Sequence, residues 1–499
     1  MADQTKLRVI KTKPRVFVTS DISNEPDDAE SLVRLLLYSN ELDIQGLVPC
    51  TSTWMRRNVH PEDMHAIVDA FAVIRDNLNA HVHPDNQYPT ADHLRSVIQD
   101  GPALYGKEAL EPGVPLSPGA KLLVDKLDAS DEPLWVLSWG GANVLAQALH
   151  HVAQSRSKDE ATRLRAKLRV YTISDQDDTG LWIRVTFPDV FYICSVHGWN
   201  EYGEAAWVGI AGDLLFPLDQ GAPDKTKITR EWLKEHIQIG PYGKAYPDYA
   251  FIMEGDTPTF LYLIQNGLGS PENPHWGSWG GRYVLTDLGG AARHYGDARD
   301  KVVGVGGQQV NSNKATIWRW RDAYQNDFAA RMQWTLTADR SKANHAPVVI
   351  VNGGSAGPEP VVIEAEAGSQ VTLDASATYD PDGDHLTFSW WQYEEPSKSQ
   401  TLVHWPAVPR LEVRPTNEQK SVVKVTMPTA DKCAVDILNG VALETGQALH
   451  LILEVKDNGK PHPMITYKRV VLQATNFQGL GGSGKKFDTV TEALGHHVR

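Results

Sequence analysis

Cysteine is scarce in this sequence, with Cys50, Cys194 and Cys433 as the three examples among 499 residues. They are far apart and form no CxxC pair, which excludes a disulfide framework and a cysteine-based zinc site. The sequence also lacks a Walker A motif, a GxSxG motif and a GxGxxG motif followed by an acidic partner. Kinase, serine hydrolase and dinucleotide oxidoreductase functions are therefore excluded.

Positive charge is limited as well. The chain has 48 Lys and Arg against 62 Asp and Glu, a formal net charge of −14, and no long basic run. This balance argues against nucleic acid and against an anionic membrane surface as partners. It suits a neutral small molecule such as a sugar, a nucleoside or an oligosaccharide, and it is compatible with a homo-oligomer.

Long apolar runs are missing too. No stretch approaches the roughly 20 apolar residues of a membrane span, and the N-terminal residues lack the apolar core of a signal peptide. We expect either an intracellular protein or a chain that begins after a removed signal, and the sequence leaves both open.

The length predicts two domains, because 499 residues exceed what one compact core usually holds. Residues 14–340 alternate short apolar runs with amphipathic segments, which predicts an α/β domain with a mostly parallel sheet covered on both faces. Residues 341–476 contain short alternating segments broken by Gly, Pro and Asp, a pattern typical of an all-β sandwich. Residues 1–13 are expected to form an N-terminal tail, and residues 477–499 a Gly-rich linker and tail.

Individual elements of the first domain follow from the same patterns. The predicted strands are residues 15–20, 44–49, 134–139, 168–174 and 190–195. The predicted helices start near Ala29 and cover residues 61–77, 143–151 and 159–167. Residues 75–120 are rich in His, Pro, Asp and Gly and are expected to form a lid or loop excursion.

A dense acidic run follows the first predicted strand. Between residues 21 and 28, the sequence DISNEPDD supplies the carboxylates of Asp21, Glu25, Asp27 and Asp28. This crowding is costly unless a cation lies among the acids, and calcium and magnesium take oxygen ligands. The positive end of the following helix relieves part of the repulsion. Because ligands bind at such strand-to-helix crevices in open α/β sheets, the run predicts a metal-centred active site.

The acidic run resembles the amino-terminal signature of nucleoside hydrolases, a strand followed by D-x-D-P-G-x-D-D and a helix. Asp21 matches its first position, and Asp27 and Asp28 match its last two. The family's water-activating aspartate falls on Ser23, whereas a carboxylate stands at Glu25 instead.

The resemblance extends over residues 14–340 through further blocks at residues 51–61, 139–149, 171–178 and 253–260. The variant D-I-x-x-[D/E]-P-D-D is similar to a branch of nucleoside-hydrolase-like proteins with an appended immunoglobulin-like domain, some of them described as cellulose-binding. The resemblance therefore implies a nucleoside-hydrolase-like α/β domain followed by an immunoglobulin-like sandwich.

A calcium site is part of what the resemblance implies. Asp21, Asp28 and Asp256 would hold the ion, together with a backbone carbonyl at or beside Ala142. Asp256 precedes Thr-Pro, so capping of a helix N-terminus is the alternative role. The glycines before Ala142 allow close approach to a ligand, although a tight turn explains them equally well.

Sugar contacts are expected from acidic and aromatic side chains. A carboxylate can accept two hydroxyl donors from a vicinal diol, and flat aromatic rings stack on sugar rings. A solvated acidic turn is the alternative for residues 174–178. The candidate sugar-binding residues are Asp27, Asn143, Asp175, Asp177, Asp178, Trp54, Trp182 and Trp276.

The resulting expectation is a calcium-dependent glycoside hydrolase with an N-ribosyl, O-furanosyl or oligosaccharide substrate. Glu25 or Asp21 would accept the proton of a water that attacks the anomeric carbon. The alternative is a non-catalytic carbohydrate-binding protein, for example a cellulose binder, on a hydrolase-like fold. The missing aspartate at Ser23 and the tryptophan-rich loops motivate this alternative. The family's histidine is also missing, because Glu254 and Gly255 occupy its place, so leaving-group activation by that histidine is not expected.

A second acidic run, DPDGD at residues 380–384, lies in the predicted sandwich. Its glycine comes too early for an EF-hand, and the position of the closing glutamate holds Trp391. The sequence favours a plain turn here, with calcium binding as the alternative.

Overall fold

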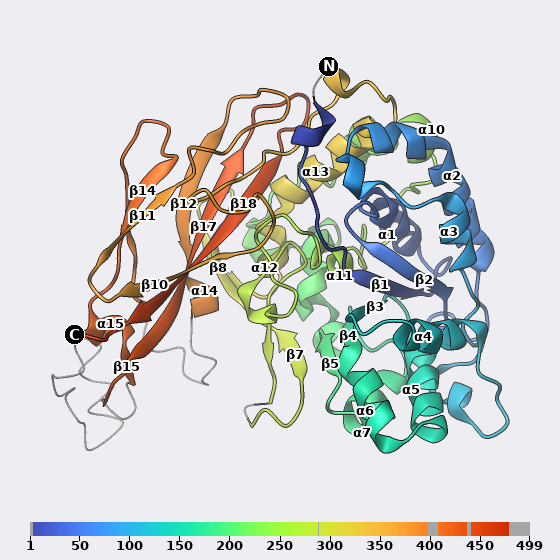
Figure 1. Cartoon of the computed structure of the whole chain (residues 1–499). Coiled ribbons are helices and arrows are strands. Elements are labelled where there is room, and N and C mark those ends of the chain that lie inside the picture. Colours follow the sequence, from blue (N-terminus) through green and yellow to red (C-terminus); the bar gives the residue numbers. More distant parts are fainter. Residues whose placement is uncertain (1–2, 288, 398–407, 437–440, 479–499) are drawn as a thin grey trace. The chain divides into compact units, whose positions relative to one another are not determined.

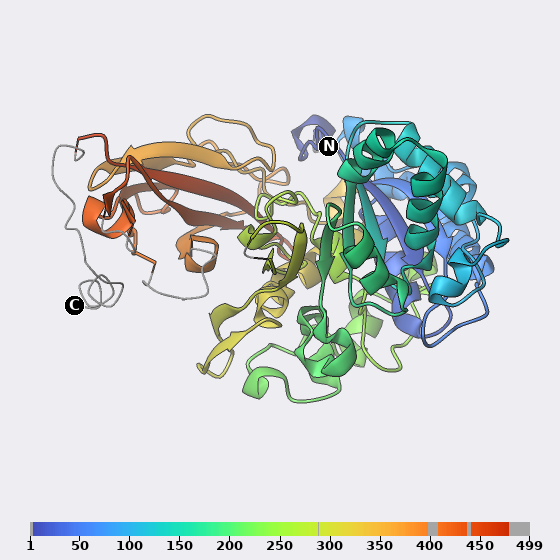
Figure 2. The same ribbon diagram turned by 90° about the horizontal axis from the view of Figure 1, so that it is seen from below.

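The computed structural model describes residues 3–287, 289–397, 408–436 and 441–478 (Figures 1 and 2). The chain divides into two compact units. The first contains residues 3–5, 10–264 and 269–343, and the second contains residues 6–9, 265–268 and the described residues from Asn344 onward. Most of the predicted C-terminal tail, residues 479–499, lies outside the described residues.

The first unit is built on a sheet of seven strands in the order β2-β1-β3-β4-β5-β7-β6. All neighbours are parallel except β6, which runs antiparallel to β7. A separate hairpin is formed by β8 and β9. The strands are β1 (Arg15–Ser20), β2 (Asp43–Pro49), β3 (Leu134–Ser138), β4 (Leu168–Thr172), β5 (Phe191–Cys194), β6 (Tyr283–Leu285), β7 (His294–Asp297), β8 (Asp300–Val303) and β9 (Gln309–Ser312).

Helices cover both faces of this sheet (Figure 1). Side chains of alternate strand positions, including Phe17, Val136 and Val170, pack against α4, α5, α6 and α7 in one continuous core, and α1 and α2 lie on the opposite face. The helices are α1 (Pro26–Leu37), α2 (Pro61–Ala80), α3 (Ala91–Ser96), α4 (Pro118–Asp128), α5 (Asn143–Ser155), α6 (Lys158–Lys167), α7 (Thr179–Thr186), α8 (His197–Asn200), α9 (Arg230–His236), α10 (Gly240–Gly243), α11 (Pro258–Leu261), α12 (Ala315–Trp318) and α13 (Arg321–Trp334). Among the described residues, no helix combines the length and the apolar character that crossing a bilayer requires.

The predicted α/β class of the first unit is confirmed, and its five main strands lie within one or two residues of their predicted bounds. The prediction for residues 75–120 was wrong in part. Helix α2 continues to Ala80, α3 interrupts the expected loop, and α4 begins at Pro118. The segment before β1 is also anchored, since Ile10 is buried and its backbone exchanges two hydrogen bonds with the side chain of Asn86.

The second unit is a sandwich of two sheets, as predicted. One sheet has the order β10-β18-β17-β12 and the other the order β11-β14-β13; all pairings are antiparallel except β10 with β18. Leu373, Val423, Leu451 and Leu472 are among the buried side chains between them. The elements are β10 (Val361–Glu366), β11 (Gln370–Asp374), β12 (Thr387–Tyr393), β13 (Glu412–Pro415), β14 (Val422–Thr426), β15 (Val435–Asp436), β16 (Val441–Ala442), β17 (Thr445–Lys456), β18 (Ile465–Thr475), α14 (Glu394–Ser397) and α15 (Ala430–Cys433).

Candidate active site

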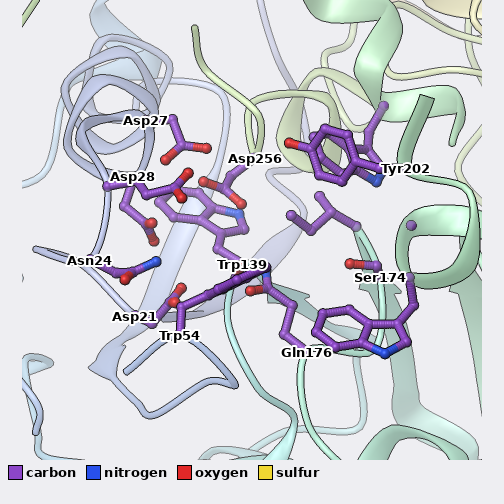
Figure 3. Close-up of a pocket in the computed structure, with 15 residues that line it drawn as sticks. Asp21, Asn24, Asp27, Asp28, Trp54, Trp139, Ser174, Gln176, Tyr202 and Asp256 are labelled. Atoms are coloured by element: carbon purple, nitrogen blue, oxygen red, sulfur yellow. Dashed lines mark hydrogen bonds between the residues drawn. The ribbon is translucent and has the colours of Figure 1, made fainter. Parts of the chain in front are cut away.

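A cavity of about 290 Å³ opens at the carboxyl edge of the parallel sheet (Figure 3). The segments that directly follow β1, β3, β4 and β5 all contribute to its wall, as expected for a site at the strand ends of an α/β sheet. The lining residues are Asp21, Asn24, Glu25, Asp27, Asp28, Trp54, Trp139, Ile173, Ser174, Gln176, Gly198, Trp199, Tyr202, Trp207 and Asp256.

Three carboxylates meet in this cavity. Asp27, Asp28 and Asp256 each place an oxygen within 4.8 Å of the other two, and all three side chains are buried. Figure 3 shows them turned toward one another, with Asp21 in the same cavity. The structure therefore brings Asp256 to the acidic run from a position more than 200 residues later in the chain.

The start of α1 explains how two of these acids are positioned. Glu25 is the N-cap residue in an extended conformation, and Pro26 occupies a first-turn position, where a missing N–H costs nothing. The helix consequently begins three residues before the predicted Ala29. Asp27 and Asp28 lie in its first turn, beside the positive end of the helix dipole.

Burial and mutual repulsion disfavour the charged forms of the clustered acids. Burial, and then the neighbouring carboxylates, raise the pKa of Asp27 to about 8, and burial raises the pKa of Asp21 to about 6. The pKa values of Asp28 and Asp256 lie well above the ordinary range for the same two reasons. The charged groups that act most strongly on these four residues are other carboxylates.

The donor set fits a hard divalent cation. The buried Oδ2 atom of Asp256 has no hydrogen-bond partner, and leaving such an oxygen unsatisfied is costly. Thr257, rather than Asp256, occupies the N-cap position of α11, and no side-chain capping bond forms there. The alternative role of Asp256 as a helix cap is therefore not observed, whereas an oxygen-only cluster is what calcium or magnesium prefers.

Two glycines allow the backbone to lie against these acids. A Cβ atom at Gly140 would lie 2.8 Å from Oδ1 of Asp21, and one at Gly255 would lie 2.7 Å from Oδ2 of Asp27. A side chain at position 255, such as the histidine expected from the resemblance, would displace the carboxylate of Asp27 from this arrangement. The preceding residue, Glu254, is buried and pairs with Arg34 at 2.6 Å.

The candidate base Glu25 and Ser23, which stands at the family's usual position for the base, differ in location. Glu25 lines the cavity, and partial burial raises its pKa. Ser23 has a left-handed backbone with φ of 80° and donates a hydrogen bond to Asp63 on α2. Ser23 is not among the lining residues, so the family's usual position for the base does not face this cavity.

Aromatic side chains form the rim. Trp54 and Trp199 are 63% and 55% exposed, and their ring centroids are 5.9 Å apart. Tyr202 also lines the cavity, and Trp207 does so with a buried Nε1 that has no hydrogen-bond partner. Trp54 was predicted from the sequence, whereas the other three were not. Their signal was available in the aromatic and Gly-rich residues 198–207, which directly follow the fifth predicted strand.

Comparison with known proteins gives a family for this arrangement. Residues 15–283 match the family described as "Cellulose-binding Sde182, nucleoside hydrolase-like domain". The chain belongs to this family. Residues 370–474 match the "Cellulose-binding protein Sde0182, C-terminal domain", so the predicted family resemblance is confirmed.

A solved structure supports membership of the Sde182 family. The nucleoside hydrolase-related hypothetical protein from Saccharophagus degradans, associated with carbohydrate metabolism, is 30% identical, with 93% of this chain and 100% of that chain covered and a TM-score of 0.73. The effector protein XOO4466 is 12% identical over 67% of this chain and 95% of its own, and its TM-score of 0.28 supports no conclusion. No curated protein matches the chain.

The acidic loop after β4 borders a second cavity, of about 610 Å³, in this Sde182-family chain. Asp175 pairs with Arg184 at 2.6 Å, and Asp178 accepts a hydrogen bond from the backbone N–H of Lys107. Asp177 accepts two hydrogen bonds from Thr179, and its buried Oδ2 has no partner. These three acids and Trp182 line the second cavity rather than the first, and their part in sugar binding stays a prediction.

Three further candidates lie elsewhere. Asn143 is fully buried and donates hydrogen bonds to Thr51 and to the carbonyl of Leu104. Its side chain therefore holds the loops of these residues and does not line the cavity. The carbonyl of Ala142 accepts the N–H of Ala146 at the start of α5, and Ala142 does not line the cavity. Trp276 ends a short 3-10 helix (Pro274–Trp276) and is likewise not a lining residue.

Proposed function

We propose that the first unit is a calcium-dependent glycoside hydrolase. The observation that carries this proposal is the meeting of Asp27, Asp28 and Asp256, three buried carboxylates, in an aromatic-rimmed cavity. Asp28 and Asp256 would hold the ion together with Asp27, and Asp21 would complete the acidic wall. The bound cation would orient sugar hydroxyls and lower the pKa of a water molecule.

The remaining chemistry belongs to side chains of this chain. Glu25 would accept the proton of the attacking water, because its partial burial raises its pKa toward that of a useful base. Asp21 is the second candidate for this role. The surrounding negative charge would stabilise the oxocarbenium-like centre that forms when the glycosidic bond breaks. The expected outcome is a single displacement at the anomeric carbon.

An oligosaccharide suits the site better than a nucleoside. The two cavities share Gln176 and Trp199 as lining residues, so they are neighbours. The exposed ring of Trp199 would stack on a sugar between them. The family name and the carbohydrate-metabolism association of the S. degradans relative agree with a sugar ligand.

The test is turnover of a substrate panel. The protein would be incubated with calcium and with nucleosides, aryl furanosides and plant-wall oligosaccharides, and released sugar would be measured. We expect release that a chelator stops and that Asp28→Asn abolishes, whereas Asp76→Asn on the exposed face of α2 leaves it unchanged. A protein that releases no sugar from any member of the panel contradicts the proposal.

The second candidate function is carbohydrate binding without catalysis. It is favoured by the position of Ser23, which stands where the family places its base and is hydrogen-bonded to Asp63. In this case cellulose or an oligosaccharide would bind without any turnover. Trp54→Ala would then weaken the binding, as measured by pull-down and calorimetry.

A further inference from the structure

Carboxylates from two loops of the sandwich unit converge at a place that has no part in the cavity described above. Asp380, Asp382 and Asp384, in the connection between β11 and β12, each place an oxygen within 4.8 Å of the other two. The connection between β17 and β18 contributes Asp457. The two connections are joined by a hydrogen bond of 2.8 Å from the N–H of His385 to Oδ1 of Asn458.

Asp457 is the observation that points to a ligand. Its side chain is only 4% exposed, and its Oδ1 atom accepts hydrogen bonds from Asn344, from the N–H of Gly459 and from the N–H of Met464. Its buried Oδ2 atom has no hydrogen-bond partner. Buried oxygens of this kind are rare in folded proteins and require an explanation such as a bound ion.

Asp380 repeats this arrangement. Its Oδ1 atom accepts the N–H groups of Asp382 and Asp384, at 2.8 and 3.1 Å, while its buried Oδ2 has no partner. Two carboxylates from different loops therefore keep one oxygen fixed by backbone donors and leave the other open.

The surrounding charge is mainly negative. Adjacent residues link the two groups of acids, because Asn344 donates to Asp457 while the backbone N–H of His345 donates to Asp382. Burial raises the pKa of Asp457 to about 6, and the charge of Asp380 adds to this shift. The pKa of Asp380 is raised by burial and by Asp382 and Asp384. A basic group, His345, contacts the cluster: its backbone N–H and Nδ1 lie 2.9 to 3.0 Å from the carboxylate oxygens of Asp382.

We propose that Asp380, Asp382, Asp384 and Asp457 form a calcium site of the sandwich unit. The donors are oxygens, which excludes a soft-metal site. Several carboxylates from two loops suit the large, flexible coordination sphere of calcium, whereas magnesium demands near-octahedral geometry and keeps its waters. The ion would fasten the two connections to each other, and the proposal does not depend on the function of the first unit.

The experiment counts calcium ions on the full chain. Equilibrium dialysis would use radioactive calcium at concentrations up to about 5 mM, which exceeds the Kd values of weak extracellular calcium modules. All variants would carry Asp28→Asn, which is expected to remove calcium binding at the cavity. Asp457→Asn and Asp380→Asn are suitable variants, because an asparagine keeps the accepting Oδ1 and replaces only the open oxygen. The control is Asp374→Asn, an exposed aspartate on β11 outside the cluster.

We expect one calcium ion per Asp28→Asn chain, none after addition of Asp457→Asn, and one after addition of Asp374→Asn. Circular dichroism and a cooperative unfolding transition verify the fold, and Asp380→Asn decides the matter if Asp457→Asn does not fold. The proposal is overturned if Asp28→Asn chains bind no calcium, or if the Asp457→Asn and Asp380→Asn variants still bind it with unchanged affinity.

Discussion

Gly255 shows how one missing side chain shapes the acidic cluster. Because a Cβ atom there would lie 2.7 Å from Oδ2 of Asp27, Gly255→Ala should push this carboxylate away from Asp28 and Asp256. We expect calcium affinity at the cavity to fall about tenfold, on the order of 1.4 kcal/mol, with the fold retained. Calorimetric titration with calcium measures this.

The control for this substitution is Gly203→Ala, since a Cβ atom at Gly203 meets nothing closer than 3.5 Å. Equal affinities in the two variants would show that Asp27 does not need its present position.

Glu254 has a structural role next to the same cluster. Its carboxylate pairs with the buried Arg34 and accepts a hydrogen bond from Tyr246. Glu254→Gln removes the charge that compensates Arg34, and breaking a buried pair in this way costs roughly 3 to 5 kcal/mol. We expect a correspondingly lower urea midpoint, and an unchanged midpoint would mean that Gln325 and the carbonyl of Tyr324 suffice as partners of Arg34.

Residue-level prediction from the sequence succeeded where charge density or family resemblance gave a signal. The acidic run identified Asp21, Glu25, Asp27 and Asp28, and the resemblance added Asp256; all five line the cavity. The position of Asn143 shortly after two glycines says nothing about the direction of its side chain, which turns to Thr51 and does not line the cavity. The orientation of Ser23 toward Asp63 also depends on tertiary packing that no local pattern encodes.

At the scale of elements, the cavity is a product of loops held by a regular sheet. The loop after β2 is tied to the loop after β4 by the N–H of Thr53, which donates to the carbonyl of Gln176 at 2.7 Å. The strands were predictable because buried parallel strands are continuous apolar runs. The short helices in residues 75–120 were not, because His, Pro and Gly mask their weak periodicity and their stability comes from packing.

The loop that carries α8 supports a prediction about ligand length. Trp199 lines both cavities and is more than half exposed. Trp199→Ala should weaken binding of oligosaccharides by about 1 kcal/mol, the order of a contact made by an aromatic side chain, and affect a monosaccharide less. Calorimetry with sugars of increasing length measures the difference.

The matched control for Trp199→Ala is Trp232→Ala, because Trp232 lies on α9 and does not line either cavity. A loss of affinity that is the same for mono- and oligosaccharides would contradict a ligand that extends over both cavities.

At the scale of the whole molecule, the acidic cavity couples stability to pH. The pKa of Asp21 is raised to about 6 and that of Asp27 to about 8, so the folded state binds more protons than the unfolded state between pH 3.8 and about 8. Stability must then fall as pH rises through this window. In a chelator we expect the unfolding temperature of the first unit to decrease with pH, and Asp27→Asn should reduce this decrease. A pH profile identical in Asp27→Asn and the parent chain would contradict the argument.

Calcium should stabilise both units, each through its own binding site. A ligand that binds only the folded state stabilises it by about 2.7 kcal/mol at a concentration 100 times its Kd. This raises the unfolding temperature of a unit by a few °C, and more for the smaller sandwich than for the first unit. Because the units have separate cores, Asp28→Asn should abolish the calcium response of the first unit alone. Asp457→Asn should abolish that of the sandwich alone. Differential scanning calorimetry with and without calcium resolves the two transitions, and a single variant that removes both responses would mean that only one site binds the ion.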